Sequence, residues 1–303
     1  MFISAFRDKM SNKNLTISFL GIGLMGLPMC TNIAKAGFAV KAFNRNIEKL
    51  NALKEFGVNT CNTLQEAVSE TDIIITMLSD DEAVLDVLNQ IIKLDYKKNS
   101  IFIDMSSIKF STAKKIHDIT KQNNLRYMDA PVSGGPEGAK SASLAIMAGG
   151  EQLDFDDCHD VLKTMGNPTL VGPSGSGQVA KLCNQIIVGV TIGAVAEAII
   201  LCEATGADPT KFIQAVAGGF ADSKILQNHG NRMVAKDFAP RGKTHTHLKD
   251  MNNIIECAKD YQTELPISNL IQKMYQSLVN AGLGDNDHSS LYKEILKLNK
   301  RGI

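Results

Sequence analysis

The chain has 303 residues, 44% of them hydrophobic and 21% charged, which is typical of soluble globular proteins and is long enough for two domains. Lys and Arg together number 32, as do Asp and Glu, so the formal net charge is zero. A neutral chain has no global field that favours nucleic acid or an anionic membrane. We therefore expect neither as a partner, and any anion site must be local.

The N-terminal residues, MFISAFRDKMSNKN, predict a short polar extension, with Met10 as an alternative start. They lack the continuous apolar stretch and the small-residue cleavage site of a signal peptide. The six cysteines are scattered and form no Cys-x-x-Cys pair, which is typical of reduced thiols. We therefore expect a cytoplasmic protein.

Short β-branched segments alternate with amphipathic helical patterns as far as about residue 172. Near-continuous Val, Ile and Leu in such segments favour a parallel sheet with helices on both faces. The predicted strands are 15–21, 39–44, 58–61, 72–78, 100–104, 126–130, 143–148 and 169–172. The predicted helices are 24–36, 46–55, 80–94, 111–123 and 152–164. Residues 14–174 thus predict a doubly wound α/β domain.

The pattern changes at the segment GPSGSG, residues 172–177, after which no convincing strand occurs. The predicted helices are 177–204, 209–218, 223–235, 246–261, 266–281 and 287–298, so residues 175–303 predict an all-helical domain. The most apolar stretch, 186–202, contains Glu197 and falls short of the ~18–20 uncharged residues of a membrane span, which predicts a buried helix. Its surplus of apolar surface favours a homodimer or homotetramer.

A glycine-rich loop follows the first predicted strand and opens the helix at 24–36. In a G-x-G-x-x-G loop the first glycine allows a tight turn, the second admits a pyrophosphate, and the third lets helix and strand pack closely. The strand-loop-helix context favours dinucleotide binding over the alternative of a structural glycine turn. The loop residues are Gly21, Ile22, Gly23, Leu24, Met25 and Gly26.

The second predicted strand ends in Phe43, Asn44 and Arg45. An NAD site places an acidic residue about twenty positions after the glycines, on the ribose hydroxyls. A carboxylate would repel the 2′-phosphate of NADP, whereas a guanidinium binds it in bidentate fashion. Asn44 and Arg45 therefore favour NADP. NAD stays open, as does a role for Arg45 as a solvated turn residue.

Three further strand ends carry candidate ligand contacts, because open α/β sheets bind ligands at the carboxyl ends of their strands. Leu78 ends the fourth strand, and Ser106 and Ser107 follow the fifth. The serines could lie beside a nicotinamide or cap the next helix. The run Ser133-Gly134-Gly135 exposes consecutive backbone N–H groups, which form either an anion nest for a carboxylate or a simple turn.

Lys181, Asn184 and Gln185 lie at the start of the apolar helix, with a spacing that puts them on one face. An ammonium can stabilise the charge that develops on a carbonyl oxygen as hydride arrives, and can donate the proton. The alternative is that the stem of Lys181 runs along the surface to water. In another predicted helix, Lys249 and Asp250 suit either a cofactor or carboxylate contact, or a surface ion pair.

No metal site is predicted. His245 and His247 form an isolated H-x-H without an evident third ligand, and His247 and His288 are expected to be structural. Glu197 is expected to be a partnered structural carboxylate.

Five blocks of sequence carry a resemblance to a known family. They are GIGLMGLPM (21–29) with FNRN (43–46), DMSS (104–107), DAPVSGGPEGA (129–139), GSGQVAKLCNQ (175–185) and HLKDM (247–251). In this order they resemble the β-hydroxyacid dehydrogenase family, which includes 3-hydroxyisobutyrate dehydrogenase, tartronate semialdehyde reductase and glyoxylate/succinic semialdehyde reductases. The resemblance extends from about residue 15 to 298.

The resemblance implies a Rossmann-like domain, a helical domain and an active site between them. It implies that Lys181 is catalytic, that Asn184 helps to hold the substrate, and that Ser133-Gly134-Gly135 binds the substrate carboxylate. It also implies that Lys249 closes over the cofactor and that Ser107 lies near the nicotinamide. Many relatives have two asparagines after the lysine. Here the second position is Gln185, and the resemblance gives it no role.

The implied reaction is hydride transfer between NADP(H) and a short β-hydroxyacid or semialdehyde. The C-terminal sequence GLGDNDHSSL (282–291) resembles tartronate semialdehyde reductases most, although similar endings occur elsewhere in the family. One alternative is an imine reductase on the same scaffold, but those enzymes usually lack a lysine at the position of Lys181. Another is a non-catalytic dinucleotide-binding or dimerisation module, which predicts loss of Lys181 or of the Ser-Gly-Gly run. Both are present.

Overall fold

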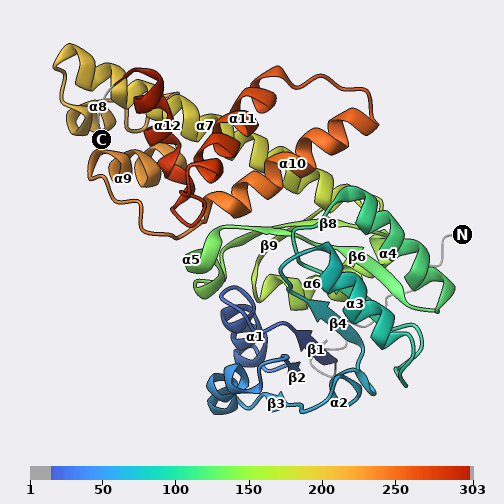
Figure 1. Ribbon diagram of the computed structural model, residues 1–303. Helices are drawn as coiled ribbons and strands as arrows, with labels where there is room; N and C mark the ends of the chain where they lie inside the picture. Colours follow the sequence, from blue (N-terminus) through green and yellow to red (C-terminus); the bar gives the residue numbers. More distant parts are fainter. Residues whose placement is uncertain (1–14, 301–303) are drawn as a thin grey trace, which may run out of the picture. The chain divides into compact units, whose positions relative to one another are not determined.

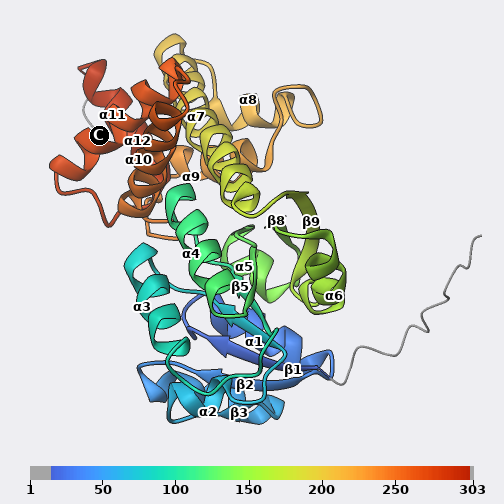
Figure 2. The same ribbon diagram turned by 90° about the vertical axis from the view of Figure 1, so that its right-hand side faces the viewer.

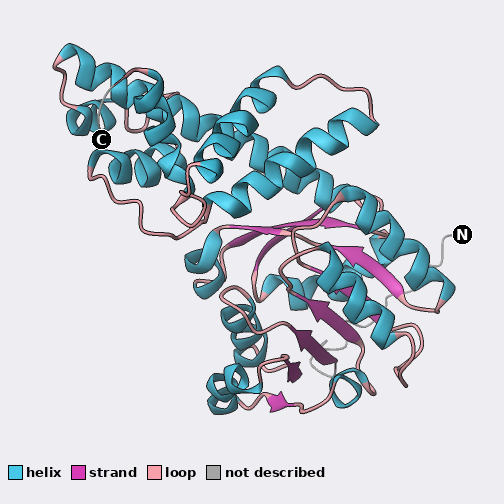
Figure 3. Cartoon of the chain, in the orientation of Figure 1, coloured by secondary structure: helices cyan, strands magenta, loops and turns pink. Residues whose placement is uncertain are grey.

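The computed structural model describes residues 15–300 (Figure 1), so the predicted N-terminal extension with Met10 lies outside the described residues. The chain divides into two compact units, of which the first ends at Lys181 and the second begins at Leu182. This division falls inside one continuous helix, α7 (Ser176–Thr205). Within residues 15–300, strands occur in the first unit alone (Figure 3).

The first unit is built on one sheet with the strand order β3-β2-β1-β4-β5-β6-β8-β7, with β9 paired to β8. The first six strands of this path are parallel neighbours in the Rossmann order. The order reverses between β1 and β4, which is the point where such sheets bind their ligands. The strands are β1 (Thr16–Leu20), β2 (Ala39–Phe43), β3 (Asn59–Thr60), β4 (Ile73–Thr76), β5 (Ile101–Asp104), β6 (Arg126–Asp129), β7 (Val132–Ser133), β8 (Leu144–Gly149) and β9 (Gly166–Gly172).

The sheet departs from the predicted parallel arrangement at β8. This strand runs antiparallel to both β6 and β7, whereas β9 is parallel to it. The chain reaches β8 through the short strand β7 and the short helix α5 (Gly135–Lys140), neither of which was predicted. A parallel return needs a longer crossover, so this short connection reverses the chain direction.

Helices cover both faces of the sheet, as the doubly wound prediction requires. The predicted helices appear with small shifts at their ends, and the segment at 47–56 is a 3-10 helix. A short helix, α2, was not predicted. The helices are α1 (Gly26–Lys35), η2 (Ile47–Phe56), α2 (Leu64–Val68), α3 (Asp81–Ile91), α4 (Phe110–Gln122) and α6 (Gln152–Lys163).

The two faces are separated by the alternation of side chains along each strand. Ile17 and Phe19 of β1 pack in one core with α1, η2, α5 and α6, while Leu20 packs in the other with α2, α3 and α4. In β5, Ile103 and Phe102 divide in the same way. Figure 2 shows α3 and α4 side by side. Buried strands of this kind explain why the sequence shows continuous apolar runs.

The second unit is helical throughout its described residues, as predicted. Its core gathers around two buried tyrosines, Tyr275 and Tyr292. The helices after α7 are α8 (Pro209–Ala215), the π-helix η3 (Leu226–Gly230), α9 (Asn231–Val234), α10 (Thr244–Asp260), α11 (Pro266–Asn280), the 3-10 helix η4 (His288–Ser290) and α12 (Leu291–Leu298).

Helix α7 is less buried than predicted. Only 39% of its most apolar window is buried, and Ile187 and Leu201 are each 64% exposed. Glu197 is also exposed, and an exposed carboxylate needs no structural partner, so its exposure does not support the predicted structural role. By length and composition alone α7 could cross a membrane, but core helices of proteins without a membrane pass the same test. The prediction of a buried helix therefore holds for one side of α7 and is wrong for the other.

Candidate active site

The glycine loop after β1 is shaped by close backbone packing. Gly21 has φ +103°, and a methyl group there would overlap the carbonyl oxygen of Met77. A methyl group at Gly26 would overlap the carbonyl oxygen of Gly21. In contrast, no atom lies within 4 Å of the corresponding point at Gly23. The first and third glycines thus serve the fold, and the second leaves open space where a phosphate can approach the backbone.

Helix α1 begins without a side-chain cap. Met25 occupies its N-cap position and makes no capping hydrogen bond, and the first turn holds no acidic residue. Leu24, just before it, is 71% exposed. The first N–H groups of a helix have no partner within the helix, and they carry its positive dipole end. The start of α1 is therefore suited to a pyrophosphate.

Asn44 ties the glycine loop to the end of β2. The backbone N–H of Ile22 donates to Asn44 Oδ1 over 2.9 Å, and Asn44 Nδ2 donates to the carbonyl oxygen of Asn46 over 2.9 Å. The neighbouring Arg45 is exposed. The sequence pattern presented Asn44 as a residue that selects the cofactor, whereas in the structure it also holds the loop in place.

The strand ends at β4 and β5 are linked by Ser106. Its buried hydroxyl accepts a hydrogen bond from the N–H of Leu78 over 2.9 Å, so this serine secures the chain around Leu78. Ser107 is half-buried. Neither serine occupies the N-cap position of α4, which is Lys109, and the Lys109 side chain makes no capping hydrogen bond.

The Ser133-Gly134-Gly135 run has a backbone that glycine adopts most readily. Ser133 ends β7, and the two glycines that follow have φ values of +137° and +62° and are exposed. Both values lie in the region that favours glycine. Successive N–H groups in such a turn can converge on a carboxylate.

Asp129, at the end of β6, anchors the start of α7. Its Oδ1 accepts the N–H of Gly175 over 2.6 Å and its Oδ2 accepts the N–H of Gln178 over 2.7 Å. A methyl group at Gly177 would overlap the carbonyl oxygen of Met147, so the helix start packs directly on the strand ends. Burial raises the pKa of Asp129 to about 6, against the effect of these N–H groups. Sequence reasoning missed this anchor.

The side chain of Gln178 adds two more links at the same point. Its Oε1 accepts the N–H of Ile108 over 3.2 Å, and its Nε2 donates to the carbonyl oxygen of Ser106 over 2.8 Å. Gln178 itself is fully buried. The first turn of α7 is therefore held from several sides, and Lys181 follows three residues later.

A second buried carboxyl, Asp104, pairs in register with Asp129 across β5 and β6. Its Oδ1 accepts the hydroxyl of Thr76 over 2.8 Å, and its Oδ2 has no hydrogen-bond partner among residues 15–300. Burial raises the pKa of Asp104 to about 7, although bonds from Ser106 and Thr76 lower it.

In the second unit, α7 and α10 share a chain of polar side chains. Asn184 Nδ2 donates to Gln185 Oε1 over 2.8 Å, and Gln185 Nε2 donates to Asp250 Oδ2 over 2.6 Å. Lys249 Nζ lies 4.0 Å from Asp250 Oδ1. Four residues singled out in the sequence thus meet here. The alternative of a surface ion pair between Lys249 and Asp250 does not fit in one respect, because Asp250 is buried.

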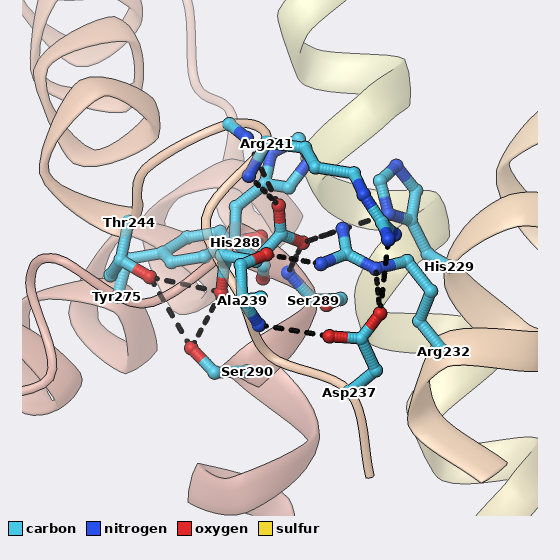
Figure 4. A network of polar contacts seen from close by, with 12 residues as sticks. His229, Arg232, Asp237, Ala239, Arg241, Thr244, Tyr275, His288, Ser289 and Ser290 are labelled. Atoms are coloured by element: carbon cyan, nitrogen blue, oxygen red, sulfur yellow. Dashed lines mark hydrogen bonds and ion pairs between the residues drawn. The ribbon is translucent and has the colours of Figure 1, made fainter. Parts of the chain in front are cut away.

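A polar cluster that sequence reasoning missed lies around Asp287 (Figure 4). The Arg232 guanidinium lies 2.8 Å from Asp287 Oδ1, and both side chains are buried. The rings of His229 and His288 meet edge to face with centroids 4.7 Å apart. Burial, together with His247 and His229, lowers the pKa of His288 to about 3, so this ring is neutral at neutral pH.

His229, Asp287 and His288 have the residue types of a metal site, and their potential ligand atoms lie within 4.8 Å of one another. The carboxylate is already committed elsewhere. Asp287 Oδ1 accepts from Arg232 and from the N–H of Ser289, and Oδ2 accepts from the N–H groups of Arg241 and Gly242. A cation would have to displace the guanidinium. The geometry is therefore that of a buried ion pair joining α9 to the N-cap residue of η4.

Comparison with known proteins agrees with this fold and these motifs. Residues 16–180 match the family described as the NAD binding domain of 6-phosphogluconate dehydrogenase. Residues 175–295 match the family described as the NAD-binding of NADP-dependent 3-hydroxyisobutyrate dehydrogenase. The two matches together span both units.

Similar proteins carry dehydrogenase and reductase names. The 2-hydroxy-3-oxopropionate reductase of Escherichia coli is 37% identical over 93% of this chain and 97% of its own length. A probable 3-hydroxyisobutyrate dehydrogenase-like protein of Arabidopsis thaliana is 32% identical over 98% of this chain and 90% of its own. The 3-hydroxyisobutyrate dehydrogenase of Mycobacterium tuberculosis, solved with L-serine, has a TM-score of 0.86 and 28% identity, covering 93% of this chain and 99% of that one.

An imine reductase from Pseudomonas sp. matches with a TM-score of 0.59 and 21% identity, covering 93% of this chain and 99% of that one. This likeness shows a shared fold and no more. The long matches to named dehydrogenases and reductases, together with the glycine loop, decide the family. The chain belongs to the β-hydroxyacid dehydrogenase family, and it is an oxidoreductase with a binding domain for a nicotinamide dinucleotide.

Proposed function

We propose that this protein reduces a short semialdehyde that carries a carboxylate, with NADPH as the preferred cofactor and Lys181 as the proton donor. The observation that carries the proposal is the anchored start of α7. Asp129 and Gln178 fix the first turn of this helix, so the backbone of Lys181, one turn later, has a defined position from which its ammonium can reach the substrate. A general acid must be held at hydrogen-bonding distance from the atom it protonates.

Each group of residues has a distinct task in this proposal. A nicotinamide dinucleotide, when bound, supplies the hydride. The uncapped start of α1 and the open backbone at Gly23 hold its pyrophosphate. The N–H groups of Ser133-Gly134-Gly135 hold the substrate carboxylate. Lys181 stabilises the developing alkoxide and protonates it, and Asn184 positions the substrate. Leu78, Ser107 and Lys249 contact the cofactor.

The substrate class is supported by the names of the relatives and by the C-terminal sequence at 282–291. The relative with 37% identity is named for 2-hydroxy-3-oxopropionate, and others are named for 3-hydroxyisobutyrate. The test is a panel of 2-hydroxy-3-oxopropionate, methylmalonate semialdehyde, succinic semialdehyde and glyoxylate with NADPH. We expect the highest kcat/KM for 2-hydroxy-3-oxopropionate. If the protein reduced none of the four compounds, the proposed function would be contradicted.

Arg45 is proposed to select NADP by binding its 2′-phosphate. Replacing Arg45 by aspartate should lower the ratio of kcat/KM for NADPH to that for NADH by at least about tenfold, because a bidentate charge-assisted contact becomes a repulsion. Steady-state kinetics with both cofactors measures the ratio. The matched control is Lys49→Asp on the exposed side of η2, which should leave the ratio unchanged. An unchanged ratio in Arg45→Asp would remove Arg45 from cofactor selection.

We also propose that a second copy of the chain covers the exposed apolar side of α7, giving a homodimer or homotetramer. Ile187 and Leu201 are large, apolar and mostly exposed on this helix, and such surface favours association. Light scattering should give two or four times the chain mass of 32.8 kDa. The variant Ile187→Lys should lower that mass, and the control Ile267→Lys, at an exposed position of α11, should not. A wild-type mass of 32.8 kDa would refute this proposal.

A cytoplasmic location remains a prediction from the cysteine pattern.

A further inference from the structure

Gln185 is the residue of the α7 start to which the resemblance assigns no role. In the structure it lies between two side chains of the candidate site. Its Oε1 accepts from Asn184 Nδ2 over 2.8 Å, and its Nε2 donates to Asp250 Oδ2 over 2.6 Å. A glutamine amide is both an acceptor and a donor, so it can join an amide to a carboxylate without leaving either end mismatched.

The helices that carry this bridge are packed closely one turn further on. A methyl group at Gly189 of α7 would lie 2.6 Å from His247 Nε2 and 3.3 Å from Met251 Sδ, both on α10. Gly189 is four residues after Gln185, and Asp250 lies between His247 and Met251 in α10. The spacing of the two helices at this point is therefore set by direct contact of Gly189 with α10.

Asp250 gives the bridge its direction. This carboxylate is buried, and its Oδ1 lies 4.0 Å from Lys249 Nζ. An ionised carboxylate only accepts hydrogen bonds, so the amide of Gln185 must turn its Nε2 towards Asp250 and its Oε1 towards Asn184. That oxygen in turn can only accept, so Asn184 must present Nδ2 to it and direct Oδ1 the other way. The charge on Asp250 thus sets the orientation of the Asn184 amide through one intervening residue.

We propose that Gln185 is a positioning residue, which transmits the orientation of the Asp250 carboxylate to the amide of Asn184 and so fixes the substrate contact made by Asn184. This inference rests on the proposed function, in which Asn184 holds the substrate. Gln185 itself takes no part in the transfer of hydride or proton. Its loss should therefore raise KM for the semialdehyde more than it lowers kcat, and should leave KM for NADPH nearly unchanged.

The test uses the variant Gln185→Glu, which keeps the size of the side chain and replaces its donor nitrogen by an oxygen. At pH 8 two carboxylates would face each other at the Asp250 contact, and the bridge breaks. Two carboxylates so close favour sharing one proton, and lowering the pH to 6 promotes the O–H···O bond that this shared proton makes. We expect KM for the semialdehyde to rise roughly tenfold at pH 8. We expect the ratio of variant to wild-type KM to return towards one at pH 6.

A second glutamine offers a matched control. Gln272 of α11 also donates to α10, from Nε2 to Asn252 Oδ1 over 2.9 Å, but its partner Asn252 is exposed whereas Asp250 is buried. Gln272→Glu should leave KM at its wild-type value at both pH values. The shorter variant Gln185→Asn should also raise KM for the semialdehyde, because its amide cannot span the distance to Asp250.

Two readouts separate the possible failures. The difference in melting temperature between Gln185→Glu and wild type should be larger at pH 8 than at pH 6, with the variant less stable. This readout reports the contact between the two carboxylates without any substrate. A wild-type protein that turns over no semialdehyde would refute the proposed function, and the role of Gln185 with it. A wild-type protein that is active, with a Gln185→Glu variant whose KM is unchanged at pH 8, would refute the positioning role alone.

Discussion

Lys181→Ala is expected to lower kcat by about 10²–10⁴-fold, the range found when a general acid or a donor to a developing oxyanion is removed. The ammonium is proposed to act only as charge develops on the substrate oxygen, so the loss should appear in kcat and kcat/KM together. The affinity for NADPH, measured by fluorescence titration, should stay the same. Stopped-flow measurement of NADPH oxidation in a single turnover would locate the loss in the chemical step.

Two further variants make this prediction sharper. Lys181→Arg keeps a positive charge but holds its proton too firmly to donate it, so its kcat should also be low. Lys211→Ala removes an exposed lysine of α8 and should retain wild-type kcat. If Lys181→Ala kept kcat within about threefold of wild type, a difference below the range for any positioned acid, Lys181 would not be the proton donor.

Asp129→Ala is expected to lower the free energy of unfolding by about 2–6 kcal/mol, since it leaves two buried backbone N–H groups without acceptors at about 1–3 kcal/mol each. These are the N–H groups of Gly175 and Gln178 at the start of α7. Urea unfolding at pH 8, followed by circular dichroism, measures the change. Asp156→Ala, at an exposed position of α6, is the control and should change stability by no more than about 0.5 kcal/mol.

The pH dependence of stability gives a second measure of Asp129. Burial raises its pKa to about 6 from an ordinary value of 3.8, so the folded state binds more protons than the unfolded state between these values. The extra stability that comes from this bound proton is therefore fully present below pH 3.8 and is lost as pH rises through about 6, whereas the hydrogen bonds to Gly175 and Gln178 remain at pH 8. The alanine variant should lack this part of the slope. An unchanged slope would show that Asp129 does not titrate in the folded protein as its burial indicates.

Much of the fold could be predicted, because its signals are local. Strands buried on both faces give continuous apolar runs, and the glycines at 21, 23 and 26 mark the first turn of a Rossmann unit. The failures are local as well. The connection from β6 to β8 was misjudged because its Gly-Gly-Pro sequence resembles a plain turn, whereas it holds a two-residue strand and a six-residue helix. Segments this short carry no periodicity.

The candidate site divides in the same way. Lys181, Asn184 and the Ser-Gly-Gly run could be found from residue type, spacing and resemblance. Their supports could not. Asp129 and Gly175 are 46 residues apart, and Gln185 and Asp250 are 65 apart. The two partners of the Arg232–Asp287 ion pair are also far apart in sequence. No local pattern marks a residue whose partner is brought to it only by the fold.

The anchored start of α7 bears on motion in this protein. The backbone of a helix normally opens first at its ends, so the amide hydrogens there exchange with solvent faster than those in the middle of the helix. At the start of α7 the N–H groups of Gly175 and Gln178 donate to the buried carboxylate of Asp129. The side chain of Gln178 makes two further hydrogen bonds, to the backbone of Ile108 and of Ser106. Deuterium should therefore enter this terminus as slowly as it enters the middle of a helix. Lys181 then needs no ordering when substrate arrives, since folding has already restricted its backbone.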